Sequence, residues 1–290
     1  MSEPYVFAKT ECELGEGPLW SARHEALFWT DINNNLVLKK GITGDVETWK
    51  FDEPVSAFAR IPGSDDFVLS AATGLYHWSP QDHTKKLILP VEDQNPITRS
   101  NDARTDRSGG FWISSMGYKA EKGAGSLYRF FKGELVTVAS DLTIPNSLCF
   151  SPDGSTAYFS DTLTSQIIKW PLNAQTGLPE GPAEVFVDIS GTGFGPDGSV
   201  VDAEGYLWNA QWGGHRVVRY KPDGTVDRIV EVGASQPTCP AFGGADYKTL
   251  FVTTAREHLS EQQLAKEPLA GSVFAVPIDT PGLPDPELQM

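Results

Sequence analysis

A short motif that recurs six times along the chain constrains the fold more than any other feature of the sequence. It is a run of aromatic and β-branched residues ending in a small hydroxyl or amide residue: LFWT (27–30), FVLS (67–70), FWIS (111–114), YFS (158–160), LWN (207–209) and LFVT (250–253). The last residues of successive copies lie 40, 44, 46, 49 and 44 positions apart. This period is typical of the blades of a β-propeller.

The sequence around each copy repeats as well. A polar turn precedes it, as in TDRSGG (105–110) and SPDGST (151–156), and a second alternating strand follows it, as in GSLYRFF (125–131). Evenly spaced alternating strands separated by Gly, Pro and Asp turns indicate an antiparallel all-β structure. We therefore predict a six-bladed β-propeller, with residues 1–290 forming a single domain.

Both ends of the repeat array predict how the ring closes. The segment YVFAKT (5–10) alternates like a strand but belongs to no complete copy, and the last copy lacks an outer strand. We expect the N-terminal strand to pair into the last blade and close it. One segment, REHLSEQQLAKEPLAG (256–271), breaks the pattern and predicts a polar helical turn inserted into the sixth blade.

Charge and cysteine content narrow the possible partners. The formal net charge is −15, which argues against nucleic acid and against an anionic membrane surface. The three cysteines (Cys12, Cys149 and Cys239) show no metal-ligand spacing, and the first residues do not resemble a signal peptide. We expect a cytoplasmic protein with reduced thiols, a monomer or weak homodimer, whose partner is a small molecule.

Polar residues recur at one position of the repeat. Counting back 12 to 14 residues from the end of the motif reaches the start of each innermost strand, where four copies carry an oxygen side chain: Glu16, Asn101, Asn146 and Asp197. The second copy offers Ser56 or Ala57, and the sixth offers Cys239. Innermost strands of a propeller surround the central axis, so these side chains are expected to converge there.

Two carboxylates that converge in a buried place repel each other, and a divalent cation removes that repulsion. Carboxylate and amide oxygens are the ligands that hard cations prefer. The alternative is that Asn146 and Asp197 only shape turns, since IPNSL (144–148) and GPDGS (195–199) are both good turn sequences. That alternative explains each residue alone but not their shared register with Glu16.

Several of these segments resemble one known family. ELGEGPLW (13–20), RSNDAR (99–104), IPNSL (144–148), GPDGSVVDAEGYLW (195–208) and the segment 242–256 are similar to the gluconolactonase, regucalcin and luciferin-regenerating-enzyme superfamily, over roughly residues 12 to 277. Among the members of this superfamily, the segments most resemble those of bacterial sugar lactonases such as xylonolactonase-like proteins. The resemblance implies a six-bladed propeller with one divalent cation (calcium, magnesium, manganese, iron(II) or zinc).

The resemblance also assigns roles to residues. It implies that Glu16, Asn146 and Asp197 bind the metal and that Arg99 and Asn101 contact the substrate. Asp197 is then the expected proton acceptor. The N–H donors of the Arg99 guanidinium, which form a rigid fork, are expected to face the lactone. The expected reaction is hydrolysis of a pentono- or hexonolactone to its aldonic acid. A calcium-binding propeller without enzymatic activity is the alternative.

Two departures from the family pattern concern the site. Ser147 follows Asn146 where many relatives have Gly, so the backbone there is expected to avoid a conformation reserved for glycine. Lys119 stands where some animal members carry an acid that contacts the sugar. It lies in the segment 114–126, which we expect to form a long loop at the mouth of the pocket, with Tyr118 able to stack on a sugar ring.

Overall fold

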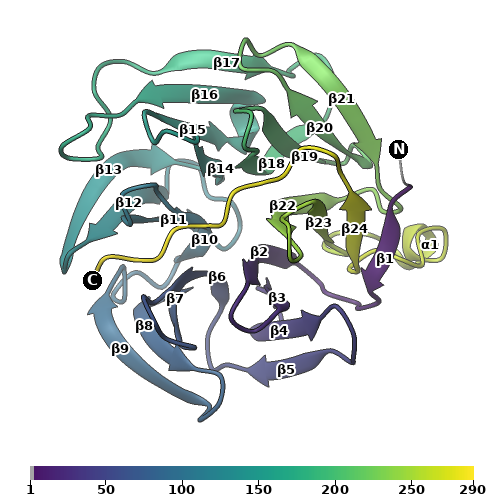
Figure 1. Ribbon diagram of the computed structural model, residues 1–290, viewed down its shortest axis with the longest axis horizontal. Helices are drawn as coiled ribbons and strands as arrows, with labels where there is room; N and C mark the ends of the chain where they lie inside the picture. Colours follow the sequence, from purple (N-terminus) through teal and green to yellow (C-terminus); the bar gives the residue numbers. More distant parts are fainter. Residues whose placement is uncertain (1–2) are drawn as a thin grey trace.

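Six antiparallel sheets of four strands surround a central axis in the computed structural model, which describes residues 3–290 (Figure 1). Each sheet is one blade, and the first strand of each blade along the chain, except for the closing strand β1, lies nearest the axis. The predicted six-bladed β-propeller is confirmed. Among residues 3–290, no helix is long and apolar enough to cross a membrane.

The strands follow one another from the axis outward in each blade. Blade 1 comprises β2 (Gly15–Ser21), β3 (Ala26–Asp31), β4 (Leu36–Gly41) and β5 (Glu47–Lys50). Blade 2 comprises β6 (Val55–Arg60), β7 (Phe67–Ala71), β8 (Gly74–Ser79) and β9 (Thr84–Pro90). Blade 3 comprises β10 (Thr98–Thr105), β11 (Phe111–Gly117), β12 (Gly125–Phe131) and β13 (Glu134–Leu142).

The second half of the ring repeats this arrangement. Blade 4 comprises β14 (Pro145–Phe150), β15 (Thr156–Asp161), β16 (Gln166–Pro171) and β17 (Glu184–Asp188). Blade 5 comprises β18 (Gly195–Val201), β19 (Leu207–Trp212), β20 (Arg216–Tyr220) and β21 (Val226–Glu231). Blade 6 comprises β22 (Pro237–Gly243), β23 (Thr249–Thr254), β24 (Val273–Pro277) and β1 (Tyr5–Ala8).

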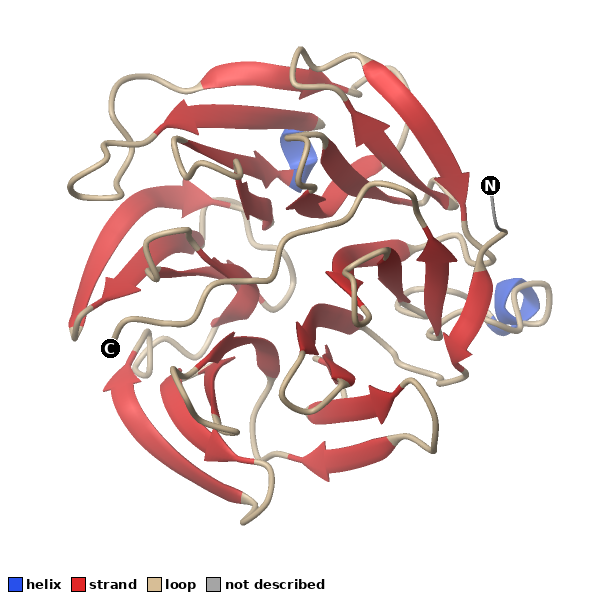
Figure 2. Ribbon diagram, viewed as in Figure 1, coloured by secondary structure: helices blue, strands red, loops and turns tan. Residues whose placement is uncertain are grey.

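The ring closes as the sequence predicts. Strand β1 pairs antiparallel with β24, with Tyr5 opposite Ala275 and Val6 opposite Phe274. The predicted insertion in blade 6 contains α1 (Glu261–Leu264), which begins with a capping box between Ser260 and Gln263. Figure 2 shows α1 and the second short helix, η1 (Thr162–Thr164), against an otherwise all-strand molecule.

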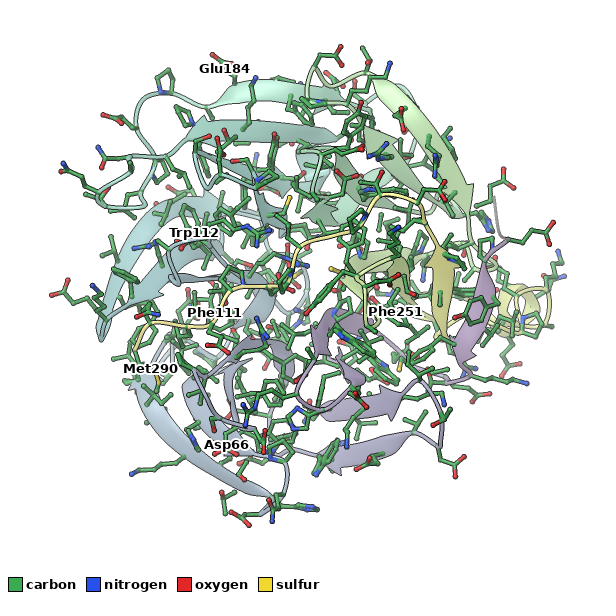
Figure 3. All side chains as sticks on the ribbon, viewed as in Figure 1. Asp66, Phe111, Trp112, Glu184, Phe251 and Met290 are labelled. Atoms are coloured by element: carbon green, nitrogen blue, oxygen red, sulfur yellow. The ribbon has the colours of Figure 1, made fainter. Side chains whose placement is uncertain are left out.

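Large aromatic side chains fill the spaces between neighbouring blades. Trp112 of blade 3 packs against Phe150 of blade 4 with ring centroids 5.4 Å apart, and Trp208 of blade 5 packs against Phe242 of blade 6. Both indoles are fully buried. Figure 3 shows Trp112 inside the ring and Glu184 at its outer edge. The blades are therefore joined by apolar contacts.

Blades 3 and 5 each contain a buried polar cluster of the same kind, which orients the indole of that blade. In blade 3 the carboxylate of Asp106 accepts hydrogen bonds from Trp112 Nε1 (2.9 Å) and Arg129 Nε (2.6 Å). In blade 5 Asp202 accepts the equivalent bonds from Trp208 Nε1 and from Arg219 (Nε and Nη2). Each buried charge has its partners, so the clusters hold the blade cores without an unpaired ion.

A β-bulge interrupts all six innermost strands close to the end at which each strand begins. The pairing register shifts between Glu16 and Leu19 in β2, between Asn146 and Cys149 in β14, and between Pro196 and Ser199 in β18. The same shift occurs in β6, β10 and β22. A bulge bends a strand and redirects a side chain, so the ring carries six redirected positions around one end of the axis.

The C-terminal segment covers the other end of the axis. Residues 280–290 cross the face of the ring from β24 towards blade 3, in yellow in Figure 1. Arg104 pairs with Asp285 at 2.9 Å, and the backbone N–H groups of Leu288 and Gln289 donate to Arg60 and Gly109. Because these partners lie at or beyond the far ends of β6 and β10, this segment and the bulges occupy opposite ends of the central axis.

Candidate active site

A pocket of about 560 Å³ lies at the bulged end of the axis. All six residues predicted from the sequence line it: Glu16, Arg99, Asn101, Tyr118, Asn146 and Asp197. They come from blades 1, 3, 4 and 5, so the fold brings together side chains up to 181 positions apart, the separation of Glu16 and Asp197. This volume lies in the range of pockets that hold small molecules.

Glu16 reaches the pocket because glycine follows it. Gly17 has φ of 53°, in the left-handed region, and a Cβ atom there would lie 2.2 Å from the backbone oxygen of Ser56 in the next blade. Only glycine fits this close approach. The Gly17 N–H donates to Glu16 Oε2 at 2.9 Å, which directs the carboxylate.

Burial and neighbouring negative charges destabilise the ionised forms of both carboxylates of the pocket. Burial and, next, the charge of Asp102 raise the pKa of Glu16 to about 8. Burial and, next, the charge of Glu16 raise the pKa of Asp197 well above its usual range. Glu16 is 8% exposed and Asp197 is 5% exposed, so water screens neither of them well. In the absence of a cation, the pair therefore favours protonation.

Asn146 is presented to the pocket by a strained turn. Ser147 adopts φ of 62°, in the left-handed region that favours glycine, so the expectation that the backbone would avoid this conformation is wrong. The Ser147 hydroxyl donates to the backbone oxygen of Asp197 in the neighbouring blade. A second hydrogen bond runs from the Leu148 N–H to Asp102 (2.8 Å). These two bonds stabilise the bulge with Ser147 at a position that suits glycine.

Two further carboxylates fix the strands that carry Glu16 and Asn146. Asp31 lies opposite Gly15 in the strand pair. Its carboxylate accepts hydrogen bonds from the backbone N–H groups of Glu13 and Leu14, the two residues that precede Gly15, both at 3.0 Å. Asp161, opposite Pro145, accepts the equivalent pair from Thr143 and Ile144 at 2.8 and 3.0 Å. The same hydrogen-bond arrangement thus fixes the beginning of the strand that carries Glu16 in blade 1 and of the strand that carries Asn146 in blade 4.

Arg99 and Asn101 lie in β10 and contact each other. Arg99 is 5% exposed, and its Nη1 donates to Asn101 Oδ1 (2.8 Å) and to the backbone oxygen of Ser100 (2.9 Å). Burial lowers the pKa of Arg99, opposed by the charges of Glu257, Glu16, Tyr118 and Asp197. The guanidinium is thus held in one orientation beside the carboxylates.

Tyr118 forms part of the rim and is 50% exposed. The loop that holds it is shorter than expected, because β11 extends to Gly117 and β12 begins at Gly125, which leaves residues 118–124 as the connection. Lys119 also lines the pocket. The aromatic ring is therefore available to a ligand that enters from solvent.

Four further polar or aromatic residues line the pocket and are not predicted from the sequence. They are Thr162 in η1, Trp212 at the end of β19, and Glu257 and His258 at the start of the insertion in blade 6. The register also corrects the count in the sixth copy: Pro237 lies opposite Thr254, so Thr238, not Cys239, occupies the position equivalent to Glu16. The Thr238 hydroxyl donates to the backbone oxygen of Gly15.

The donor set of the pocket fits one hard divalent cation. Glu16 and Asp197 supply two buried carboxylates, and Asn146 supplies an amide oxygen. Among residues 3–290, no group of three or more His, Cys, Asp or Glu side chains is placed to hold a metal ion, so a third protein ligand here would be an amide, hydroxyl or backbone oxygen. A cation bound by these carboxylates would offset the burial and the like-charge repulsion that raise their pKa values.

Comparison with known proteins identifies the family to which the chain belongs. The SMP-30/gluconolactonase/LRE-like region matches residues 14–256. A putative sugar lactone lactonase of Rhizobium meliloti (strain 1021) is 41% identical and covers 98% of this chain and 97% of its own. The L-arabinolactonase of Azospirillum brasilense is 37% identical over 93% of this chain and 90% of its own.

A solved structure also superimposes closely. The calcium-binding protein regucalcin of Agrobacterium tumefaciens is 39% identical, with a TM-score of 0.96, over 100% of this chain and 98% of its own. The family match spans all the predicted metal-binding and substrate-binding positions, from Glu16 to Asp197. On the sequence match and the shared fold, the chain belongs to the SMP-30, gluconolactonase and LRE-like family.

Proposed function

We propose that this protein is a metal-dependent sugar lactonase, which hydrolyses a pentono- or hexonolactone to the aldonic acid. The observation that carries the proposal is the convergence of three oxygen ligands from three blades beside a buried arginine, in one pocket of about 560 Å³. The names of two relatives, a putative sugar lactone lactonase and an L-arabinolactonase, support the substrate class.

Glu16, Asn146 and Asp197 would hold one divalent cation, whose chemistry when bound is to polarise a carbonyl oxygen and lower the pKa of a water molecule. The protein residues supply the remaining steps. Arg99, fixed through its Nη1 group, offers its other N–H donors to the lactone carbonyl or to a ring hydroxyl. Asn101 and Tyr118 contribute polar and stacking contacts to the sugar.

Asp197 is the proposed general base. Its carboxylate is buried in the pocket beside the proposed cation, which would keep it ionised and able to accept a proton. It takes a proton from the attacking water as the water oxygen bonds to the carbonyl carbon. When the ring C–O bond breaks, that proton passes to the departing oxygen, and the product is a hydroxy acid that ionises in solution.

A calcium-binding propeller without enzymatic activity is the second candidate, favoured by the structural relative described as a calcium-binding protein. One experiment separates the two. The purified protein is stripped of metal, incubated with Ca²⁺, Mg²⁺, Mn²⁺, Zn²⁺ or Fe²⁺, and supplied with a panel of five- and six-carbon aldonolactones, while acid release is followed with a pH dye. The lactonase proposal predicts a cation-dependent rate on at least one lactone.

Asp197→Asn should reduce that rate by at least about a thousandfold, because the amide keeps the shape but accepts no proton. The matched control is Asp223→Asn in blade 5, which alters an exposed turn bonded only to Thr225. Circular dichroism should show both variants folded. Full activity in Asp197→Asn removes Asp197 from the mechanism, and the absence of any cation-dependent rate in the wild type favours the binding protein.

A further inference from the structure

A chain of hydrogen bonds with a single direction runs through the lining of the pocket. Arg99 Nη1 donates to Asn101 Oδ1 at 2.8 Å, and Asn101 Nδ2 donates to Asn146 Oδ1 at 3.1 Å. Asn146 Nδ2 then donates to Thr162 Oγ1 at 2.9 Å, and the Thr162 hydroxyl donates to the backbone oxygen of Pro196, also at 2.9 Å. The chain crosses from blade 3 through blade 4 to blade 5.

The chemistry of the two ends sets this direction. A guanidinium can only donate and a backbone carbonyl can only accept. The hydroxyl of Thr162 has one proton, which goes to Pro196, so its oxygen must accept from Asn146. Asn146 therefore turns its nitrogen towards Thr162, and its oxygen towards Asn101 and the pocket. Starting from Arg99, the same logic orients the Asn101 amide.

Thr162 connects two of the proposed metal ligands. It binds the side chain of Asn146 on one side, and on the other it binds the carbonyl that immediately precedes Asp197. It is the first residue of η1, it lines the pocket, and the backbone of the next blade makes room for it. A Cβ atom at Gly195 would lie 2.8 Å from Thr162 Cγ2.

We propose that Thr162 is a positioning residue, which holds the Asn146 amide oxygen towards the cation site and ties that residue to the strand bearing Asp197. This role rests on the proposed metal-dependent function, because it is defined by the cation that Asn146 would bind. Thr162 itself does not touch the substrate in this assignment, so it acts through Asn146.

Replacing Thr162 by valine keeps the shape of the side chain and removes both the acceptor and the donor. The Asn146 nitrogen then loses its acceptor, and only the Asn101 Nδ2 donor, at 3.1 Å, still distinguishes the amide oxygen from the nitrogen. A rotated amide would present N–H groups to the cation. Loss of an outer partner of a metal ligand typically weakens metal binding by about 10- to 100-fold. Thr162→Ser keeps the hydroxyl and should remain within about threefold of the wild-type Kd.

The test is calorimetric titration of Ca²⁺ and of Mn²⁺ into metal-free wild type, Thr162→Val, Thr162→Ser and a control, Thr164→Val. Thr164 lies in the same helical turn, but its hydroxyl donates to the backbone oxygen of Asp161 and it does not line the pocket. We expect weakened binding only in Thr162→Val. Thr162→Ala, which adds no bulk, replaces the valine variant if the latter does not fold.

The outcomes separate this proposal from the proposed function. A wild type that binds cation, together with a Thr162→Val variant of equal affinity, overturns the role of Thr162 and leaves the metal site intact. Equal weakening in Thr164→Val assigns the effect to the turn and also overturns it. A wild type that binds neither cation overturns both proposals. Weakened binding in the valine variant, restored in the serine variant, supports the role.

Discussion

Glu16→Gln tests whether a buried acid stands at the axis of the ring. In the metal-free protein, the pKa of Glu16 is about 8, against an ordinary value of 4.5. Between these pH values the folded protein keeps a proton that the unfolded chain releases. Stability is therefore fully present below pH 4.5 and falls as the pH rises towards 8. At 1.36 kcal/mol per pKa unit, the loss reaches roughly 5 kcal/mol.

Glutamine does not ionise, so the variant should not carry this loss. From pH 5.5 to pH 8, its free energy of unfolding relative to wild type should rise by about 3 kcal/mol. For a chain of 290 residues this corresponds to about 5 °C in Tm, by the usual unfolding entropy per residue. The remaining charges that face Glu16, chiefly Asp102, Arg99 and Arg104, are present in both proteins.

The measurement is thermal unfolding in a chelator at several pH values, repeated with saturating Ca²⁺. Glu184→Gln, at an exposed position of the outer strand β17, is the matched control. With the cation the order should reverse, because a ligand that binds only the folded protein stabilises the wild type more than the variant that lacks a ligand. If the Tm values of wild type and Glu16→Gln change in parallel with pH in the chelator, Glu16 is not the buried acid described here. Equal stabilisation of both proteins by Ca²⁺ would refute its role as a metal ligand.

The remaining predictions concern packing and the C-terminal segment. Gly195→Ala should lower the free energy of unfolding in urea by about 1–3 kcal/mol, and adding Thr162→Ser should recover most of it, because the methyl group that the new Cβ meets is gone. Simple additivity of the two changes would contradict this contact. Asp285→Ala should cost about 3 kcal/mol by the same measurement, since it leaves the buried Arg104 without its partner at 2.9 Å, and a cost below about 1 kcal/mol would show that the pair is not buried in solution.

The ring could be predicted because each blade repeats the same strand pattern. Glu16, Asn146 and Asp197 came from one register position, and the fold places all three in one pocket. In blade 6 the spacing from the motif predicts Cys239, but the strand register places Thr238, one residue earlier, at this position. A bulge adds one residue to a strand, so a fixed distance from the motif cannot resolve neighbouring positions.

Residues outside the repeating strands were harder to predict. Thr162 lies in a connection, and its importance depends on the carbonyl of Pro196 in the next blade, a contact that no local pattern encodes. Glu257 and His258 belong to the insertion, which has no counterpart in the other blades. The left-handed conformation of Ser147 was missed for the same reason: its stabilising partner, the backbone oxygen of Asp197, is fifty residues away.

Pairing of β1 with β24 has a consequence for how the molecule is made. Residues 5–8 are synthesised long before residues 273–277, the strand with which they pair. Until then the sixth blade exposes an open sheet edge that other chains could pair with. Blade 1 also has no neighbour on one side during this time. Circularly permuted chains that begin between two blades should therefore change the order of assembly, and with it the tendency of the nascent chain to aggregate, without changing the final structure.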